Sequence, residues 1–408
     1  MRGNTQIASV YSDAEGVVSR LFWAQLPYHA TVSTHTPNCT VRHSTEQIHV
    51  LGAGPAGLAA AITLARVGRS VRVTEQRADV GGRFSGNLQM LTNYTDANDA
   101  RTELLELVGS VEPTLIPQHE ASLFGPSGRR CIARSREPFG YLLQRGPGVV
   151  MLDGALRRAA EETGVEFVFG VRGETESADI VATGGRRVQG VAREWHGTVE
   201  LPDGFHVRFD HRVTPGGYGY LLVAEGRAVL GAAVVTNHKR IARAFRETVD
   251  WFSGVFPLPK IDSFSLVGSV DLFPIRTAVG ADGELYVGEA GGFCDGLFGF
   301  GIRAALQSGR IAAEALLTGA KFDERWRAAL GNRLETSIVN RWLYETGGNF
   351  GVRLFTRIAP KFDFRTVGRK LSARSHLRRR LLPLVKHTWS LDPESPHGDR
   401  TLWHRIAK

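Results

Sequence analysis

Six residues near position 50 have the types and spacing of a nucleotide-binding turn. A short β-type stretch, Ile48–Leu51, leads into Gly52-Ala53-Gly54-Pro55-Ala56-Gly57, and an Ala- and Leu-rich helical stretch follows. In such a turn the first glycine permits the tight bend, the second lets a pyrophosphate approach the backbone, and the third lets the helix pack on the strand. The helix start offers unpaired N–H groups to phosphate. The pattern predicts an adenine dinucleotide site; a tight turn without a ligand is the alternative.

An acidic residue stands where the ribose of such a dinucleotide would be. Glu75 ends a second predicted strand, Val71–Thr74, and follows Gly57 by 18 residues. Its carboxylate is placed to accept hydrogen bonds from a ribose diol. Gly82 and Arg83 follow soon after. They predict a close backbone approach to the pyrophosphate and a guanidinium that neutralises its charge.

A second strand, glycine turn and helix near residue 290 favours FAD over NAD. A predicted strand, Leu285–Val287, leads into a glycine-rich turn and then a helix from about Ile302 to Leu317. A long cofactor needs a second backbone turn to hold its flavin half. The sequence has no second complete GxGxxG motif, so a separate nicotinamide-binding domain is not predicted. The predicted flavin-side contacts are Gly288, Glu289, Gly299, Gly301 and Ile302, with Thr183 and Gly184 after a third predicted strand.

The candidate proton donors are polar residues near the predicted substrate wall. The sequence shows no Ser/His/Asp spacing, metal-ligand cluster or paired carboxylates of the kind that indicates hydrolysis. Tyr218 and Tyr220 are the predicted catalytic residues and His211 is a weaker candidate; a packing role is the alternative for each. Asp295 is interpreted as a turn or N-cap residue, with proton donation as the alternative, and Cys294 as a buried inert thiol, with a redox-active thiol as the alternative.

A family resemblance rests on these motifs. The early turn, Glu75 and the late Gly288-Glu289-Ala290 turn are similar to FAD-dependent oxidoreductases of the p-hydroxybenzoate hydroxylase fold, and more closely to the geranylgeranyl reductase group. That group carries the motif YxWxFPxxxxxxVG; here Tyr218-Gly-Tyr220-Leu-Leu222-Val223 and then Leu230-Gly231 fall in the same register. The resemblance covers about residues 47 to 320. This chain departs from it at Glu289, where Asp is usual, and at Gly296, where Pro is usual.

The resemblance implies an enzyme that uses non-covalent FAD. Reduced flavin would deliver hydride to a carbon–carbon double bond of an apolar, isoprenoid-like substrate. Tyr218, Tyr220 and Leu222 would share one face of a strand over the flavin, because alternate residues of a strand point the same way. Phe298 and Phe300 would line the same cavity, with ordinary core packing as the alternative. A monooxygenase acting on a small or polyketide-like molecule and a non-catalytic flavin-binding protein stay open, as do NAD(P)H and ferredoxin as electron donors.

These residues need an α/β scaffold with a discontinuous nucleotide-binding domain. We expect a Rossmann-like FAD-binding domain from residues 46–100, 140–190 and 265–320. An inserted antiparallel β-rich substrate domain is predicted from 101–139 and 191–264. A helical, basic segment, 321–408, would follow, and residues 1–45 are interpreted as a poorly ordered extension.

Composition and charge limit the remaining function classes. Three cysteines without paired spacing argue against a disulfide scaffold or zinc site, so no metal is predicted. The net charge of +9 is confined to residues 351–408, which carry 14 Lys and Arg against 4 Asp and Glu. No nucleic-acid motif accompanies that charge, and no nucleic-acid partner is expected. A cytoplasmic location is predicted, and peripheral membrane contact through residues 374–389 stays open, because basic residues, Leu and Trp occur together there.

Overall fold

The computed structural model describes residues 47–84, 86–185, 189–261, 265–270, 277–387, 389–391 and 403–405. The predicted N-terminal extension, residues 1–45, lies outside the described residues.

A five-stranded parallel sheet carries the early glycine turn. Its strand order is β15-β9-β1-β2-β8, and all of its pairs are parallel. The bounds are β1 Ile48–Leu51, β2 Val71–Glu75, β8 Glu166–Phe169, β9 Ile180–Val181 and β15 Leu285–Tyr286. The parallel order brings the carboxyl ends of β1, β2, β9 and β15 to one edge of the sheet, which is where ligand crevices form in open α/β sheets.

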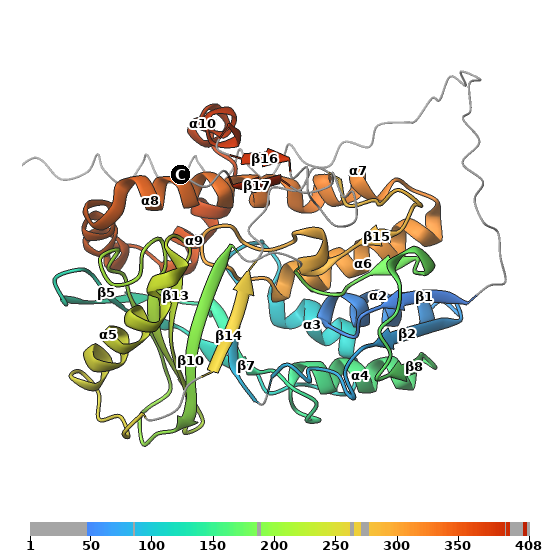
Figure 1. Ribbon diagram of the computed structural model, residues 1–408, viewed down its shortest axis with the longest axis horizontal. Coiled ribbons are helices and arrows are strands. Elements are labelled where there is room, and N and C mark those ends of the chain that lie inside the picture. The colour runs from blue at the N-terminus through green and yellow to red at the C-terminus, as the bar shows by residue number, and fades with distance from the viewer. Residues whose placement is uncertain are drawn as a thin grey trace, which may run out of the picture. The chain divides into compact units, whose positions relative to one another are not determined.

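Helices α2 (Pro55–Ala65) and α6 (Ile302–Thr318) pack against each other beside this sheet (Figure 1). Eight of the eleven residues of α2 are buried, which its Ala-rich sequence permits because small side chains allow close approach. The approach is closest at Gly309 of α6, where a Cβ atom would lie 2.0 Å from the carbonyl oxygen of Ala56. Helices α3 (Ala100–Val108) and α4 (Leu152–Glu162) also contact α2.

A seven-stranded sheet forms the second layer. Its order is β14-β10-β13-β12-β11-β5-β6, antiparallel except where β11 pairs with β5. The strands are β5 Glu120–Phe124, β6 Arg130–Arg134, β10 Gly190–Thr198, β11 Gly204–Arg208, β12 Tyr218–Ala224, β13 Arg227–Val234 and β14 Ser265–Val270. Because β14 pairs with β10, this sheet extends past the boundary expected at residue 264. A smaller sheet, β3-β7-β4, consists of Leu88–Thr92, Gly140–Gln144 and Ile116–Gln118.

One segment of the predicted β-rich domain, residues 191–264, is helical. Residues Ile241–Ser253 form helix α5, which packs against β13. Its buried residues, Ala244, Phe245, Thr248 and Phe252, have the spacing of one helix face. The many β signals on either side of this segment concealed that spacing.

The chain after Thr318 is mainly helical, as expected. It forms α7 (Phe322–Trp326), a π-helical turn at Arg327–Gly331, α8 (Asn332–Ile358), α9 (Phe364–Ser372) and α10 (His376–Lys386), and a short hairpin of Trp389–Leu391 and Trp403–Arg405 follows. Figure 1 shows α7, α8 and α10 along one side of the molecule. Within α8, Gly348 has φ +48°, so the helix kinks there and its last ten residues form a separate half. No helix in the described ranges is long and apolar enough to span a membrane.

Candidate functional site

The three glycines of the first turn differ in the space around them. At one glycine a side chain would enter a groove, and at the other two it would collide with the backbone. Gly52 has φ +106°, and a Cβ atom there would lie 2.5 Å from the carbonyl oxygen of Ala182. At Gly57 a Cβ would lie 2.0 Å from the carbonyl oxygen of Gly52. A Cβ on Gly54 would meet nothing within 4 Å. Gly52 and Gly57 are therefore required by packing, whereas Gly54 leaves space beside the groove.

The start of α2 presents its backbone to that space. Gly54 is the N-cap residue and Pro55 follows it, with no capping side chain and no acidic residue in the first turn. The free N–H groups and the positive end of the helix dipole favour an anion at this position. These features fit a pyrophosphate.

Glu75 is held rigidly at the end of β2. Its Oε2 accepts a hydrogen bond from the backbone N–H of Ala53 at 2.9 Å, and its Oε1 accepts one from the N–H of Arg77 at 2.9 Å. Each carboxylate oxygen keeps a further lone pair, because a carboxylate has about four acceptor sites. The side chain lines the groove beside the glycine turn and fits the predicted ribose contact.

The groove has a volume of about 1040 Å³ and collects fourteen of the fifteen predicted cofactor residues. The lining residues among them are Gly52, Gly54, Pro55, Ala56, Glu75, Gly82, Arg83, Thr183, Gly184, Gly288, Glu289, Gly299, Gly301 and Ile302. Gly57 is the exception, because it packs under the turn. The residues present therefore fit an adenine dinucleotide along the whole length of the groove.

Two charged residues that the sequence prediction missed also line the groove. Arg145 and Asp153 form a buried bidentate ion pair, with N–O distances of 2.8 Å for both bonds. Asp153 also accepts a hydrogen bond from the backbone N–H of Gly146. Asp153 opens α4, so this pair ties the start of that helix to the end of β7. The signal in the sequence was an Arg-Gly pair shortly before a Leu-Asp-Gly helix start, a weak pattern on its own.

The late turn, residues 293–302, separates the groove from a second cavity. Phe293, Cys294 and Gly299 line the groove. Asp295, Phe298 and Phe300 line the other cavity, which has a volume of about 350 Å³. Gly288, with φ +60°, fixes the start of this region, and its N–H donates to Ser308 Oγ at 2.9 Å. One short segment thus contributes to both spaces.

The second cavity is mainly apolar and lies between the seven-stranded sheet and the C-terminal helices. Its size is in the range of small-molecule sites. The sheet side includes Leu123, Phe205, Val207, Phe209 and Tyr218, and the helix side includes Leu343, Val352, Phe355, Phe364, Val367 and Leu371. An apolar wall of this kind suits a hydrocarbon group.

Of the three predicted strand residues, only Tyr218 reaches this cavity. Its hydroxyl donates to the carbonyl oxygen of Phe298 at 2.6 Å. Tyr220 shares the face, with ring centroids 5.7 Å apart, but its hydroxyl donates to Glu194 and its ring covers Gly231 of β13. Leu222 is buried in the apolar cluster beside the sheet. The face extends beyond the cavity because β12 lies inside the sheet, between β11 and β13.

Asp295 is the carboxyl group in the cavity wall, and its environment favours the protonated form. Burial raises its pKa, although backbone hydrogen bonds from Phe298 and Leu297 and the charges of Arg341 and Arg333 act in the opposite direction. Its Oδ2 accepts the Phe298 N–H at 2.6 Å. The surrounding protein removes it from bulk water, although it faces the cavity.

Tyrosine hydroxyls near Asp295 also stay neutral. Burial raises the pKa of Tyr94 well above its ordinary value, and the nearby Asp295 and Tyr218 raise it further. Burial likewise raises the pKa of Tyr218 and of Tyr344. Tyr94 and Tyr344 both line the cavity and were missed, because single tyrosines far apart in the sequence carry no spacing signal.

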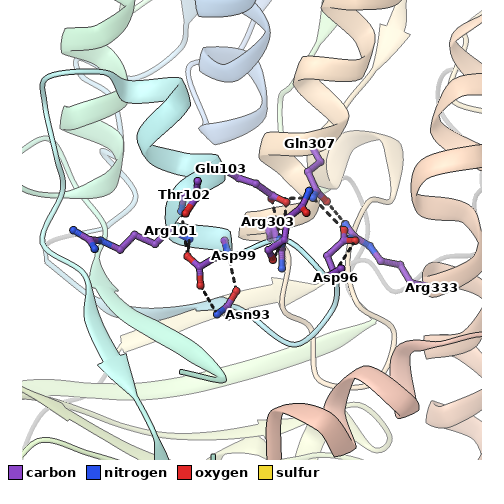
Figure 2. Close-up of polar contacts among 12 residues, drawn as sticks. Asn93, Asp96, Asp99, Arg101, Thr102, Glu103, Arg303, Gln307 and Arg333 are labelled. Carbon is purple, nitrogen blue, oxygen red and sulfur yellow. Dashed lines mark hydrogen bonds and ion pairs between the residues drawn. The ribbon is translucent and has the colours of Figure 1, made fainter. Parts of the chain in front are cut away.

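Two residues of the cavity wall, Arg303 and Arg333, belong to a network of hydrogen bonds and ion pairs (Figure 2). Arg303, which is 3% exposed, donates to Glu103 through Nε at 2.9 Å and Nη2 at 2.7 Å. Gln307 donates to Glu103 at 3.0 Å, and Arg333 donates to Asp96 at 3.0 Å and to Gln307. Burial lowers the pKa of Arg333 to about 10. Among the described residues Arg303 Nη1 has no hydrogen-bond partner, and Arg303 and Arg333 both line the cavity.

The weaker candidates lie in other surroundings. His211 stacks near Tyr344, with ring centroids 4.5 Å apart, and burial lowers its pKa, but it lines neither the groove nor the cavity. Cys294 is a buried cysteine that lines the groove. No group of three or more metal-ligating residues occurs within the described ranges.

Comparisons with known proteins agree with this geometry. Residues 50–93 match the family described as an NAD(P)-binding Rossmann-like domain. Digeranylgeranylglycerophospholipid reductase 2 of Methanothermobacter thermautotrophicus is 26% identical over 365 residues, covering 74% of this chain and 88% of the relative. Digeranylgeranylglycerophospholipid reductase of Methanosarcina acetivorans is 23% identical over 355 residues, covering 71% and 82% respectively.

Solved structures share the fold. A geranylgeranyl bacteriochlorophyll reductase-like protein from Thermoplasma acidophilum superposes with a TM-score of 0.64 at 17% identity, covering 84% of this chain and 97% of that one. A flavin-dependent brominase superposes with a TM-score of 0.57 at 17% identity, covering 84% and 100%. The predicted fold class is confirmed, as is the resemblance to geranylgeranyl reductase-like FAD-dependent oxidoreductases.

Proposed function

We propose that this chain is an FAD-dependent reductase that adds hydrogen to a carbon–carbon double bond of an apolar, isoprenoid-like substrate. The observation that carries the proposal is the shared turn, residues 293–302, which borders a dinucleotide groove on one side and an apolar cavity on the other. Relatives named as reductases of a digeranylgeranyl lipid support both the reaction and the substrate class.

The groove residues hold the cofactor by backbone and carboxylate contacts. The start of α2 and Gly54 receive the pyrophosphate, and Glu75 accepts hydrogen bonds from the ribose. The turn at Gly299 and Gly301, with the start of α6 at Ile302, borders the flavin half. The cofactor is bound without a covalent link in this proposal. When bound and reduced, FAD supplies a hydride.

The cavity residues orient the substrate and supply a proton. The apolar walls bind the hydrocarbon and exclude water, which strengthens every electrostatic interaction inside. Asp295 is the proposed proton donor, because burial raises the pKa of its carboxyl group above the ordinary value. Tyr218 lies beside it as the second candidate donor, but its hydroxyl proton is engaged by Phe298. Tyr220 is left out because its hydroxyl donates to Glu194.

The domain division and the partners follow as proposals. The five-stranded sheet with α2 and α6 forms the FAD-binding part, and the seven-stranded sheet with α5 forms the substrate part. NAD(P)H and ferredoxin are both compatible electron donors. Membrane contact of a cytoplasmic protein through residues 374–389 is supported by Leu377 and Leu384, which are 64% and 61% exposed on α10.

The direct test is anaerobic turnover of a geranylgeranyl-chain lipid by the FAD-loaded protein with a chemical reductant. The expected product carries two added hydrogens per reduced double bond, detected by mass spectrometry. Gly54→Val, which fills the groove, serves as the inactive control. Substrate-coupled oxygen uptake with a hydroxylated product would indicate that the protein is a monooxygenase and not a reductase. Bound flavin that no reductant reduces would indicate a flavin-binding protein without catalytic activity.

A further inference from the structure

The second half of α8 exposes a row of large apolar side chains. Beyond the kink at Gly348, the exposed fractions are 77% for Phe350, 51% for Leu354 and 43% for Ile358. Their spacing of four residues places them along one side of the helix. Phe362, 58% exposed, follows after a short 3₁₀ turn. These four residues are called the α8 face below.

The opposite side of the same helix is also apolar. Val352 and Phe355 line the cavity, and Val352 is 4% exposed. A helix at the surface of a globular domain needs one apolar side, directed to the core, and presents polar residues outward. The core side of this helix is already covered by the cavity wall, so packing inside the described part of the protein does not account for the α8 face. Contiguous exposed apolar side chains of this kind mark interaction surfaces.

Exposed basic side chains border the α8 face. Residues 350–387 contain eleven Lys and Arg and one acidic residue, Asp363. Arg353 and Arg357 are exposed on the same helix, three residues after Phe350 and Leu354 respectively, so they border the apolar row. Lys361 is exposed next to Phe362. Apolar side chains within a basic border match the boundary between the acyl chains and the anionic headgroups of a membrane.

We propose that the α8 face is a docking surface for an anionic lipid bilayer. The apolar row enters the upper acyl region, and the basic side chains stay at the phosphate level. The cavity lies on the other side of the same helix, so docking places the substrate cavity one helix thickness from the lipid. This inference does not depend on the proposed reaction.

The α8 face differs from the segment 374–389 that the sequence suggested. On α10, Leu381, Leu382 and Val385 pack against the first half of α8. Lys386 pairs with Glu335 at 2.9 Å. Much of the apolar surface of α10 is thus used within the protein, whereas the α8 face is not. The α8 face is therefore proposed as the main contact and α10 as its border.

Flotation of the full-length protein with vesicles tests the proposal. Vesicles of phosphatidylcholine with about a third phosphatidylglycerol are compared with phosphatidylcholine alone. We expect binding to the anionic vesicles that weakens as salt is raised, because exposed charges are screened. The double substitution Phe350→Ser with Leu354→Ser is expected to weaken binding at least about tenfold. The pair Arg353→Gln with Arg357→Gln is expected to weaken it by about fivefold per residue.

Matched controls keep the result specific. Val149 and Val150 are 51% and 55% exposed in a loop outside the C-terminal helices, so Val149→Ser with Val150→Ser removes exposed apolar side chains elsewhere. This control and both test variants should keep wild-type FAD content, which reports folding without reference to turnover. Absence of wild-type binding, or equal binding by all variants, would overturn the proposal. So would a wild-type dimer that Phe350→Ser with Leu354→Ser converts to a monomer, because the face would then belong to a second copy.

Discussion

At the scale of single residues, the site separates positions required by the fold from positions available to a ligand. Gly52, Gly54 and Gly57 belong to one motif, yet a Cβ atom would collide with backbone at the first and last and meet open space at the middle one. The motif therefore contains its own control. A substitution at the middle glycine tests binding, and one at the outer glycines tests folding.

Gly54→Val should abolish FAD binding while leaving the melting temperature within about 2 °C of that of FAD-free wild-type protein, because a bound cofactor itself stabilises the folded state. The added side chain occupies the groove and meets no protein atom within 4 Å at its Cβ position. FAD released from the purified protein by heating measures the effect. Gly347→Val, also at a glycine whose Cβ would be free, should keep full FAD. Full FAD occupancy in Gly54→Val would show that the pyrophosphate does not bind at this turn.

Asp295→Asn should increase stability at alkaline pH relative to wild type. The pKa of Asp295 is raised in the folded protein, so the folded state binds more protons than the unfolded state above about pH 3.8, the ordinary value. Wild-type stability therefore decreases as pH rises from that value through the folded pKa, and the variant lacks this decrease. Urea unfolding at pH 5 and pH 8 measures the difference.

Asp323 provides the control of opposite sign. Burial alone would raise its pKa, but hydrogen bonds from the backbone of Ala278 and from Trp326, together with the charge of Arg327, lower it overall. Asp323→Asn should therefore lose stability at neutral pH, and the loss should disappear as pH falls through the lowered folded pKa. If both variants changed stability in the same direction with pH, the raised pKa assigned to Asp295 would be wrong.

At the scale of secondary-structure elements, the structure depends on contacts between segments far apart in the chain. Helix α3 is joined to α6 by the pair of Glu103 and Arg303, 200 residues apart in sequence. Strands β12 and β13 are matched by Tyr220 and Gly231, where the ring fills the space that a glycine leaves. Both contacts are buried or nearly so, which makes each sensitive to the loss of one partner.

Glu103→Ala should destabilise the protein by about 3–5 kcal/mol, the range for removing one partner of a buried ion pair. Arg303 would remain buried without the carboxylate that pairs with its guanidinium, and among the described residues only the hydrogen bond from Nη2 to the carbonyl oxygen of Asn98 would stay. Chemical unfolding measures the loss. The comparison is Glu112→Ala, whose partner Arg101 lies on the same helix as Glu103 but is 48% exposed in its side chain. The stability lost in Glu112→Ala should stay below about 1 kcal/mol.

Tyr220→Ala should also destabilise, by about 3–5 kcal/mol, the range for removing a large aromatic side chain from a core. The ring covers Gly231 and packs in the apolar cluster beside Tyr218. Unfolding by urea measures the cost, and FAD content measured below the transition should stay near wild type. A variant with wild-type stability and altered turnover would instead support the predicted substrate-binding role of Tyr220.

At the scale of the whole molecule, two layers and a set of C-terminal helices meet around the cavity. The parallel sheet with its helices holds the groove, and the seven-stranded sheet and the helices α8 and α9 enclose the apolar space. Figure 1 shows the C-terminal helices on the far side of the chain from β8 and α4. The cavity thus exists only when three separate parts of the sequence come together.

Val352→Phe should reduce the amount of lipid that co-purifies with the protein, with little change in FAD content. The larger side chain projects into the cavity from α8. Mass spectrometry of an organic extract measures the lipid. Leu354→Phe enlarges a side chain on the outer side of the same helix and should keep the wild-type amount. An equal reduction in both would show that the lipid is bound elsewhere.

The sequence predicted the groove well and the cavity poorly, for a physical reason. The groove is built from local glycine turns, so residues such as Gly54 and Glu75 are identified by spacing within one strand–turn–helix unit. The cavity is built from side chains such as Tyr94 and Phe364, which neighbour each other only after folding. Helix α5 was missed because β-type segments surround it. Tyr218 and Tyr220 share a face, as the alternation of the strand predicts, but of the two only Tyr218 lines the cavity.

The turn from Phe293 to Ile302 limits how such a protein can acquire a new specificity. Neighbouring residues of this segment line the groove and the cavity, so a substitution that reshapes the cavity also changes the groove wall. The opposite wall, formed by α8 and α9, lines the cavity without bordering the groove. Divergence and laboratory selection for other substrates should therefore accumulate substitutions in Val352, Phe355 and their neighbours, while the turn stays unchanged.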